Sequence, residues 1–401
     1  MNNMSRLLII TGLICMVQWL EAQTLHPEEL YPFIQLKNGN YQEVIDYYIH
    51  HPENPPKVFD YLARAEAAWQ LGLYDKALDL CQEIEKMKKN ASTPLQIKIY
   101  LHHNDYSKAQ KSFLKNVESF EKISLFTLFN DPCYQKLIHT DFLDSILKAD
   151  LYSDEEKQIF KVEQLIHHEK LTEALFLVQE VISRNNHLHR AYYLHSVISA
   201  TLNDNRKALA MINEALALTK VPADYFLQRA SLLVEDNHFE EALTDIEKVI
   251  RKEPYEVNHY LYKAEILHDL GRYDEALSLA TDLLTLMPQN SNLLILKARS
   301  LYQSHQMLEA LKTVNVSFEY RQSLEQFVLR GDIYSATGTW EYALSDYSMG
   351  VDIDPFNGDL YAKKGYARLK TGDLQGACYD WKKGKRYGSH KAVRYWDTYC
   401  R

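Results

Sequence analysis

The chain of 401 residues contains little glycine, proline or cysteine, with 13, 11 and 5 residues respectively. So few helix-breaking residues favour an all-helical fold, and no sustained alternation of apolar and polar residues predicts a sheet. The chain also lacks an excess of basic residues, because its formal net charge is −9. Nucleic-acid binding needs a basic surface that releases phosphate counterions, so this charge argues against a nucleic-acid partner.

Motifs for catalysis and metal binding are also missing. The sequence contains no HExxH, CxxC or GxSxG motif and no glycine-rich phosphate loop. Its 16 histidines include adjacent pairs such as His102 and His103, but neighbouring helical residues point about 100° apart and do not converge on one metal ion. We therefore expect no enzyme activity, no cofactor, no metal site and no small-molecule substrate.

The N-terminus carries an almost wholly apolar run, Leu7–Leu20, after the single basic residue Arg6. This run is too short for a membrane core of about 30 Å, which needs about 20 residues. We interpret residues 1–22 as a cleaved export signal, which predicts a periplasmic protein that meets the membrane only during export. One alternative is an uncleaved anchor with the remaining chain facing the periplasm. Another is a lipoprotein modified at Cys15, although the bulky Ile14 precedes that cysteine.

A helix–turn–helix pattern recurs along the chain. Within residues 257–290, apolar residues return at helical spacing, Gly271-Arg272 interrupts them, the spacing resumes, and Pro288 ends it. An alanine of the second helix then repeats at steps of 34, 34, 34, 34, 33 and 34 residues, as Ala174, Ala208, Ala242, Ala276, Ala310, Ala343 and Ala377. A small residue of the first helix follows the same steps, as Ser196, Ala230, Ala264, Ala298, Gly331 and Gly365. Such small residues are expected where paired helices cross closely.

This pattern resembles the tetratricopeptide repeat (TPR) family, whose unit is a 34-residue helix–turn–helix. The resemblance implies an all-α, right-handed superhelical solenoid of antiparallel helix pairs. It also implies that the first helices line a concave face that binds peptide segments of other proteins. A one-dimensional stack suits this length, since single hydrophobic cores stop growing near about 250–300 residues.

We expect four segments after the signal. They are degenerate N-terminal TPR units at 25–123, an irregular helical wedge replacing one repeat at 124–154, a regular array of about seven units at 155–390, and a capping helix at 391–401. The wedge is alternatively a hinge or a docking surface. The chain end, with Gly376-Ala377-Cys378, Asp380-Trp381 and a final Tyr399-Cys400, resembles the ends of exported TPR proteins of Gram-negative bacteria.

Four cysteines lie outside the signal. Cys378 falls in the last second helix, against which the capping helix with Cys400 must pack, so we expect a disulfide that holds the cap. The alternative is that both are reduced core residues. A bridge between Cys81 and Cys133 has much weaker support.

Basic residues precede the small first-helix position in five successive units. Such a ladder is either an anion-binding stripe or a set of ion pairs within the repeats. Aspartates sixteen residues further on favour structural pairs, which we predict as Arg229–Asp245, Arg330–Asp346 and Lys364–Asp380.

The register places candidate ligand-binding side chains on the concave face. These are Tyr193, Glu265, Asp269, Arg299, Tyr302, Asp332 and Tyr366. Aromatic rings with nearby charges suit a peptide ligand, and the acidic residues, with Glu235, suggest neutral or basic partner segments. The Lys/Asn clamp by which some TPR proteins hold chaperone C-termini is missing, because Leu261, Glu265 and Asp269 stand in its place.

Together these features predict a non-enzymatic scaffold of the cell envelope whose partners are other envelope or secreted proteins. The alternative is a structural component of an envelope assembly or secretion machine that self-associates through residues 124–154.

Overall fold

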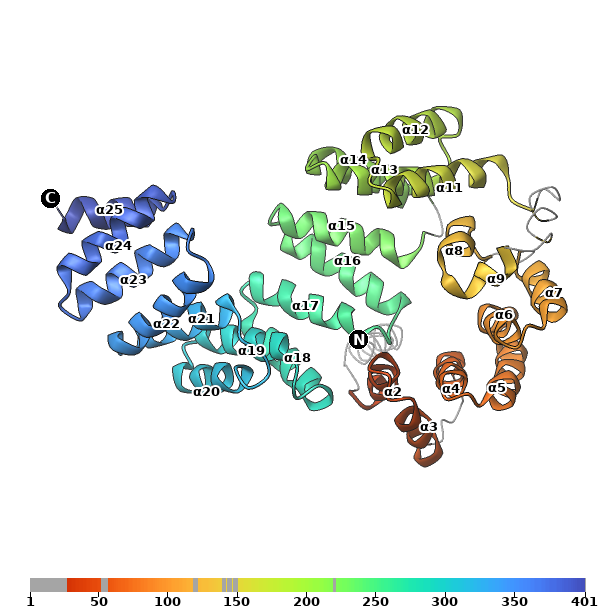
Figure 1. Ribbon diagram of the computed structural model, residues 1–401, viewed down its shortest axis with the longest axis horizontal. Helices are drawn as coiled ribbons and strands as arrows, with labels where there is room; N and C mark the ends of the chain where they lie inside the picture. Colours follow the sequence, from red (N-terminus) through yellow and green to blue (C-terminus); the bar gives the residue numbers. More distant parts are fainter. Residues whose placement is uncertain are drawn as a thin grey trace, which may run out of the picture. The chain divides into compact units, whose positions relative to one another are not determined.

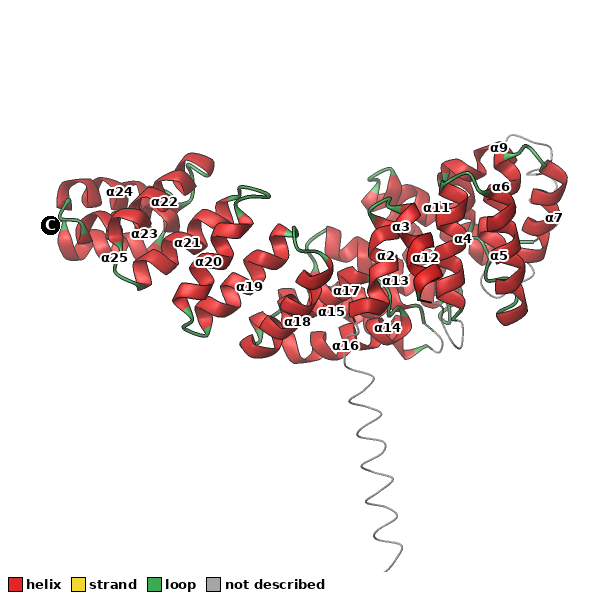
Figure 2. Ribbon diagram, turned by 90° about the horizontal axis from the view of Figure 1, so that it is seen from below, coloured by secondary structure: helices red, strands yellow, loops and turns green. Residues whose placement is uncertain are grey.

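All regular structure that we describe is helical. The computed structural model describes residues 27–51, 57–117, 122–138, 142, 146, 151–218 and 221–400. Helices are the only regular elements in these ranges, which confirms the all-α class (Figure 2). No helix among them is long and apolar enough to cross a membrane. The expected export signal at 1–22 lies outside the described residues.

Consecutive helices form antiparallel pairs in sequence order. The first helices are α2 (Pro27–Lys37), α4 (Val58–Gln70), α6 (Thr93–His102), α11 (Asp154–His167), α13 (His189–Thr201), α15 (Ala223–Glu235), α17 (Val257–Asp269), α19 (Ser291–Gln303), α21 (Leu324–Ala336) and α23 (Gly358–Lys370). Their partners are α3 (Tyr41–His50), α5 (Tyr74–Met87), α7 (Tyr106–Val117), α12 (Leu171–Arg184), α14 (Asn205–Ala217), α16 (Phe239–Lys252), α18 (Tyr273–Leu286), α20 (Met307–Ser317), α22 (Trp340–Ile353) and α24 (Leu374–Arg386).

The alanine register forms the contact between paired helices. All seven alanines, from Ala174 to Ala377, have 0% of their surface exposed. The same position is filled by Val44 in α3, Ala77 in α5 and Ala109 in α7, which are also fully buried. A methyl group at this position lets the two backbones approach closely, while larger residues one turn away fill the remaining space.

The described helices form two compact units, Glu29–Val257 and Asn258–Arg401. Within the first unit the helices follow one another around a nearly complete circle, so α2 lies beside the turn that follows α16 (Figure 1). Two contacts define this meeting: the rings of Phe33 and Tyr255 stack with centroids 4.4 Å apart, and Lys37 pairs with Glu256 at 2.9 Å. Residues more than 200 positions apart thus share one surface.

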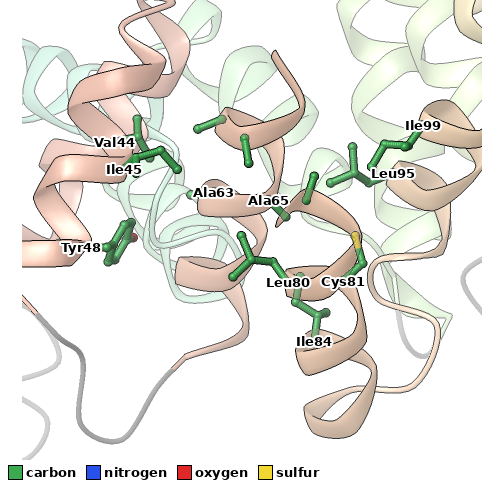
Figure 3. Close-up of a cluster of buried hydrophobic side chains, with 13 residues drawn as sticks. Val44, Ile45, Tyr48, Ala63, Ala65, Leu80, Cys81, Ile84, Leu95 and Ile99 are labelled. Atoms are coloured by element: carbon green, nitrogen blue, oxygen red, sulfur yellow. The ribbon is translucent and has the colours of Figure 1, made fainter. Parts of the chain in front are cut away.

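The core of the N-terminal repeats is drawn in Figure 3. Val44 and Ile45 of α3, small residues of α4 such as Ala65, and Leu80 of α5 all turn towards it. Cys81 belongs to this core and is a free thiol, as is Cys133, so the weakly supported bridge between them is absent. Burial raises the pKa of Cys81 to about 12, which keeps this thiol protonated and unreactive.

The segment at 124–154 is described only in part. Its described elements are short: α8 (Leu125–Asn130), a 3₁₀ turn (Pro132–Tyr134) and α9 (Gln135–Ile138). They add Leu125, Leu128 and Tyr134 to one hydrophobic cluster with α6 and α7. Its role as a wedge in place of one repeat stays a prediction.

The C-terminal helix α25 (His390–Tyr399) packs on α23 and α24. The hydroxyl of Ser389 accepts a hydrogen bond from the Ala392 amide and so caps its N-terminus. The Cys378–Cys400 disulfide is present, with Cα atoms 5.7 Å apart, and it ties the end of α25 to α24. The expected covalent bridge across this cap is confirmed.

Candidate functional site

A row of charged residues runs across the first helices of the Asn258–Arg401 unit. The guanidinium of Arg299 on α19 lies 3.5 Å from the carboxylate of Asp269 on α17 and 3.5 Å from that of Glu325 on α21. All three side chains are about one-third to one-half exposed. Arg299 therefore connects three consecutive repeats on an accessible surface.

A second charged group continues this row towards the C-terminus. Asp332 on α21 accepts a hydrogen bond from the Tyr347 hydroxyl at 2.7 Å and pairs with the Lys363 ammonium at 2.6 Å. Tyr302 lies on the neighbouring first helix, and its pKa is raised by burial and by the Asp332 charge. The structure thus brings together two of the candidate residues, Tyr302 and Asp332, and adds Lys363.

Glu265 differs from the other acids of this row. It is exposed on α17 and has no ion-pair partner within 4 Å among the described residues. Desolvation by the surrounding helices raises its pKa, and the nearby Arg299 charge opposes this change. Since Asp269 and Asp332 are paired with cations, the row is less acidic than its sequence indicates, and Glu265 differs in having no ion pair with another described residue.

Two of the candidate aromatic residues are mainly packing residues. Tyr193, in the Glu29–Val257 unit, stacks on buried Tyr225 at 4.4 Å and is covered by the Arg190 guanidinium at 4.9 Å. Tyr366 stacks on Tyr395 of α25 at 5.3 Å and so supports the cap. Both side chains are half-buried.

Sequence reasoning included Arg299 but missed two other cations of these surfaces. Arg190 pairs with Glu163 at 2.7 Å, and Lys363 pairs with Asp332, both across consecutive first helices. The only available signal was the spacing, since each pair is close to one repeat apart in sequence.

Two of the three predicted ion pairs form. Arg229 binds the buried Asp245 with two nitrogens, at 2.6 and 2.8 Å, and Arg330 binds the buried Asp346 in the same way at 2.9 and 2.7 Å. Each arginine also donates to an asparagine of the preceding second helix at 2.9 Å, and these acceptors are Asn213 and Asn315. One side chain therefore connects three helices, a structural role rather than an anion site.

The third predicted pair, Lys364–Asp380, is wrong. The carboxylate of Asp380 lies 3.3 Å from Arg368, one helical turn beyond Lys364 on α23. Burial raises the pKa of Asp380, and the Lys364 and Arg368 charges oppose this change. The Arg368 contact is a single approach of Nε, and the buried Oδ2 of Asp380 has no hydrogen-bond partner among the described residues.

The described residues contain no group of three histidine, cysteine or acidic side chains placed to hold a metal ion. The charged residues of the row are instead arranged as pairs between neighbouring helices. What the surface offers chemically is charge and aromatic area for a ligand segment.

Antiparallel helix pairs stacked in order, nearly all with a buried alanine at the same position, define an α-helical repeat protein. Two tetratricopeptide repeat family models match the chain, at residues 227–291 and 267–323. Residues 227–323 therefore carry tetratricopeptide repeats, and helix pairs of the same kind precede and follow them. No curated protein sequence matches it.

Solved structures resemble the chain at low sequence identity. A tetratricopeptide repeat protein from Parabacteroides merdae is 19% identical, with a TM-score of 0.52, over 60% of this chain and 95% of that one. The C-terminal part of a TPR repeat-containing protein from Cytophaga hutchinsonii is 13% identical, with a TM-score of 0.44, over 59% and 98%. The likeness to the Parabacteroides merdae protein concerns the fold alone.

Proposed function

We propose that this protein is a non-enzymatic scaffold that binds segments of other proteins on its first helices. The observation that supports this proposal is the half-exposed row from Glu265 to Lys363, which crosses four consecutive repeats. A ligand lying along it meets charges at regular intervals, and such charges set the register of a bound segment.

We further propose that the chain is exported and works in the cell envelope. The N-terminal apolar run supports export, and the disulfide at the C-terminal cap suits an oxidising compartment. Expression of the full chain in a Gram-negative host, followed by fractionation and mass measurement, tests this. Recovery of an unprocessed chain in the cytoplasm would overturn the export proposal.

Partner capture tests the scaffold. The mature chain is immobilised, mixed with periplasmic extract and crosslinked, and bound proteins are identified. The Glu265→Lys, Asp269→Lys double variant is expected to lose partners with neutral or basic segments by at least about tenfold, a change of about 1.4 kcal/mol. Glu341→Lys, an exposed acid of the second helix α22, is the matched control and should bind as the wild type does. Equal capture by both variants would contradict binding at this row.

Self-association is the second candidate function. The aromatic segment at 124–154 motivates it, and light scattering after size exclusion distinguishes it. A monomer at all concentrations supports the scaffold, whereas an oligomer that dissociates when residues of this segment are changed supports a structural component.

A further inference from the structure

The Glu29–Val257 unit contains a largely apolar groove, whereas the charged row belongs to the other unit. Its volume is about 310 Å³, and it runs over three first helices. Phe33 and Leu36 come from α2, Phe59 and Leu62 from α4, and Leu95 from α6. Phe59 is 47% exposed, which is unusual for a large aromatic side chain facing neighbouring apolar residues.

One end of this groove already holds a segment of the same chain. The ring of Tyr255, from the turn after α16, stacks on Phe33 at 4.4 Å and lies 5.3 Å from Phe59. The next residue, Glu256, pairs with Lys37 of α2. Aromatic rings of the groove, together with Lys37 beside it on α2, thus bind a Tyr-Glu dipeptide from over 200 residues away.

A second lysine, Lys57, also lies near the tyrosine. Burial raises the pKa of Tyr255, while the nearby Lys57 ammonium opposes this change. Lys57 in turn pairs with Glu29 at 3.2 Å, which holds its ammonium at the rim of the groove. The groove therefore provides one stacked ring and one tilted ring for an aromatic side chain, while Lys57 lies near this side chain and Lys37 pairs with the carboxylate that follows.

We propose that this groove is the docking site for a partner segment in which a tyrosine precedes an acidic residue, and that Tyr255-Glu256 occupies it until such a segment displaces them. The inference rests on the proposed scaffold function and names the chemistry of one class of partner. The internal segment is displaceable because its ion pair is exposed, with side chains 53% and 39% accessible, and such pairs contribute little.

A peptide copied from the chain tests the proposal. A fluorescent peptide of residues 251–258, RKEPYEVN, is titrated by anisotropy against the full chain and against the Tyr255→Ala, Glu256→Ala double variant. Removal of the internal competitor is expected to tighten binding at least about tenfold, because a tethered segment competes at an effective concentration near the millimolar range. The peptide RKEPAAVN should not bind either protein.

Matched variants locate the site. On the double-variant background, Phe59→Ala should weaken binding at least about tenfold, whereas Phe176→Ala, which removes another exposed phenylalanine at 73% accessibility, should not change it. Glu256→Lys alone, a surface change that repels Lys37, should also tighten peptide binding. No binding of RKEPYEVN to the double variant at about 1 mM, or binding that Phe59→Ala leaves unchanged, overturns the proposal.

Hydrogen exchange checks the internal contact independently of the peptide. Tyr255→Ala should increase deuterium uptake in α2 relative to Phe176→Ala, and equal uptake would overturn the proposal. The proposed scaffold function is tested separately. If the wild-type chain captures no protein from the extract, the scaffold proposal is wrong. If it captures proteins equally well with Phe59→Ala, only the groove proposal is wrong.

Discussion

Glycine occupies the small first-helix position in two repeats because a large ring faces it. A Cβ atom on Gly365 would lie 2.5 Å from the indole nitrogen of Trp381, and one on Gly331 would lie 2.7 Å from the ring of Tyr347. In the unit of Ala264, the residue sixteen positions on is the small Ala280. Residue volumes are thus complementary within each helix pair, and a change of side-chain volume on one helix disturbs the packing of the other.

Gly365→Ala should therefore destabilise the last repeat by about 1–3 kcal/mol through overpacking. Trp381 is fully buried and donates from its indole nitrogen to the Ala362 carbonyl at 3.1 Å, so it has little freedom to move. Urea unfolding followed by circular dichroism measures the loss. In a double-mutant cycle, Trp381→Phe should partly relieve the effect, and additive changes would contradict the steric explanation.

His268 predicts a pH dependence. It is 6% exposed, its ring nitrogen lies 3.0 Å from the Ser300 hydroxyl, and burial followed by the Arg299 charge lowers its pKa from 6.5 to about 4. Between these values the unfolded chain binds a proton that the folded chain does not. Stability should therefore fall as the pH drops from about 6.5 to about 4, by up to about 3 kcal/mol.

Unfolding midpoints measured between pH 4 and pH 7 check this prediction. His268→Gln should flatten the curve, whereas His187→Gln, at an exposed position, should leave it unchanged. Parallel curves for wild type and His268→Gln would show that this histidine is not the titrating group.

At the scale of the helix pair, each turn between first and second helix contains one residue in the left-handed region. Glycine supplies it at Gly271 with φ of 80°, but His305 adopts 60° at the corresponding position. The register therefore decides the backbone geometry even where the residue type does not favour it. Glu169 and His305 thus show that the turn forms at this place in the repeat even without glycine or asparagine.

The pairs that Arg229 and Arg330 form through two nitrogens predict strong energetic coupling between the helices that they join. Arg330→Ala would leave the carboxylate of Asp346, whose side chain is 5% exposed, without its partner, and the expected cost is about 3–5 kcal/mol. Arg272→Ala, which removes an exposed pair with Glu275, should change stability by less than about 1 kcal/mol. Chemical denaturation compares the free energies of unfolding of the two variants. Similar losses would contradict a special role for the buried Arg330–Asp346 pair.

The disulfide predicts redox-dependent order of the last helix. Cys378→Ser with Cys400→Ser, or reduction by dithiothreitol, should lower the stability of α25 by up to about 3 kcal/mol, because a loop with a sequence separation of 22 is no longer closed. Hydrogen exchange of α25 measures this. Cys133→Ser, at a free thiol, serves as the control and should leave the exchange unchanged.

For the whole molecule, a stack of repeats makes stability a local property. Each helix pair contacts mainly its sequence neighbours, so the energy of the array is close to a sum of repeat and interface terms. The Tyr255 contact with α2 is the exception within the Glu29–Val257 unit, since it connects distant parts of the chain.

The effects of substitutions should accordingly remain within their unit. Gly365→Ala is expected to increase hydrogen exchange in α23 to α25 while exchange in α4 and α5 stays at the wild-type level. Hydrogen exchange of the intact protein, measured on peptides from the whole chain, tests this. A uniform increase across both units would mean that the protein unfolds as one cooperative body.

The sequence by itself determined the helical class, the repeat length and the buried alanines, because these follow from local periodicity that recurs seven times. It also predicted the Cys378–Cys400 bridge and the Arg229 and Arg330 pairs, whose partners lie within one or two adjacent helices. Because these partners are close in the sequence, the repeat register is sufficient to predict their contacts.

Only the tertiary structure decided which charges meet across repeats and which distant surfaces meet. It replaced Lys364 by Arg368 at Asp380, paired Asp332 with Lys363, and brought Tyr255 onto Phe33. The contacts of Asp380 and Asp332 depend on the length and shape of the side chains, which the repeat register does not specify. The last depends on curvature accumulated over many repeats, where a small rotation at each interface determines whether the two ends of a unit touch.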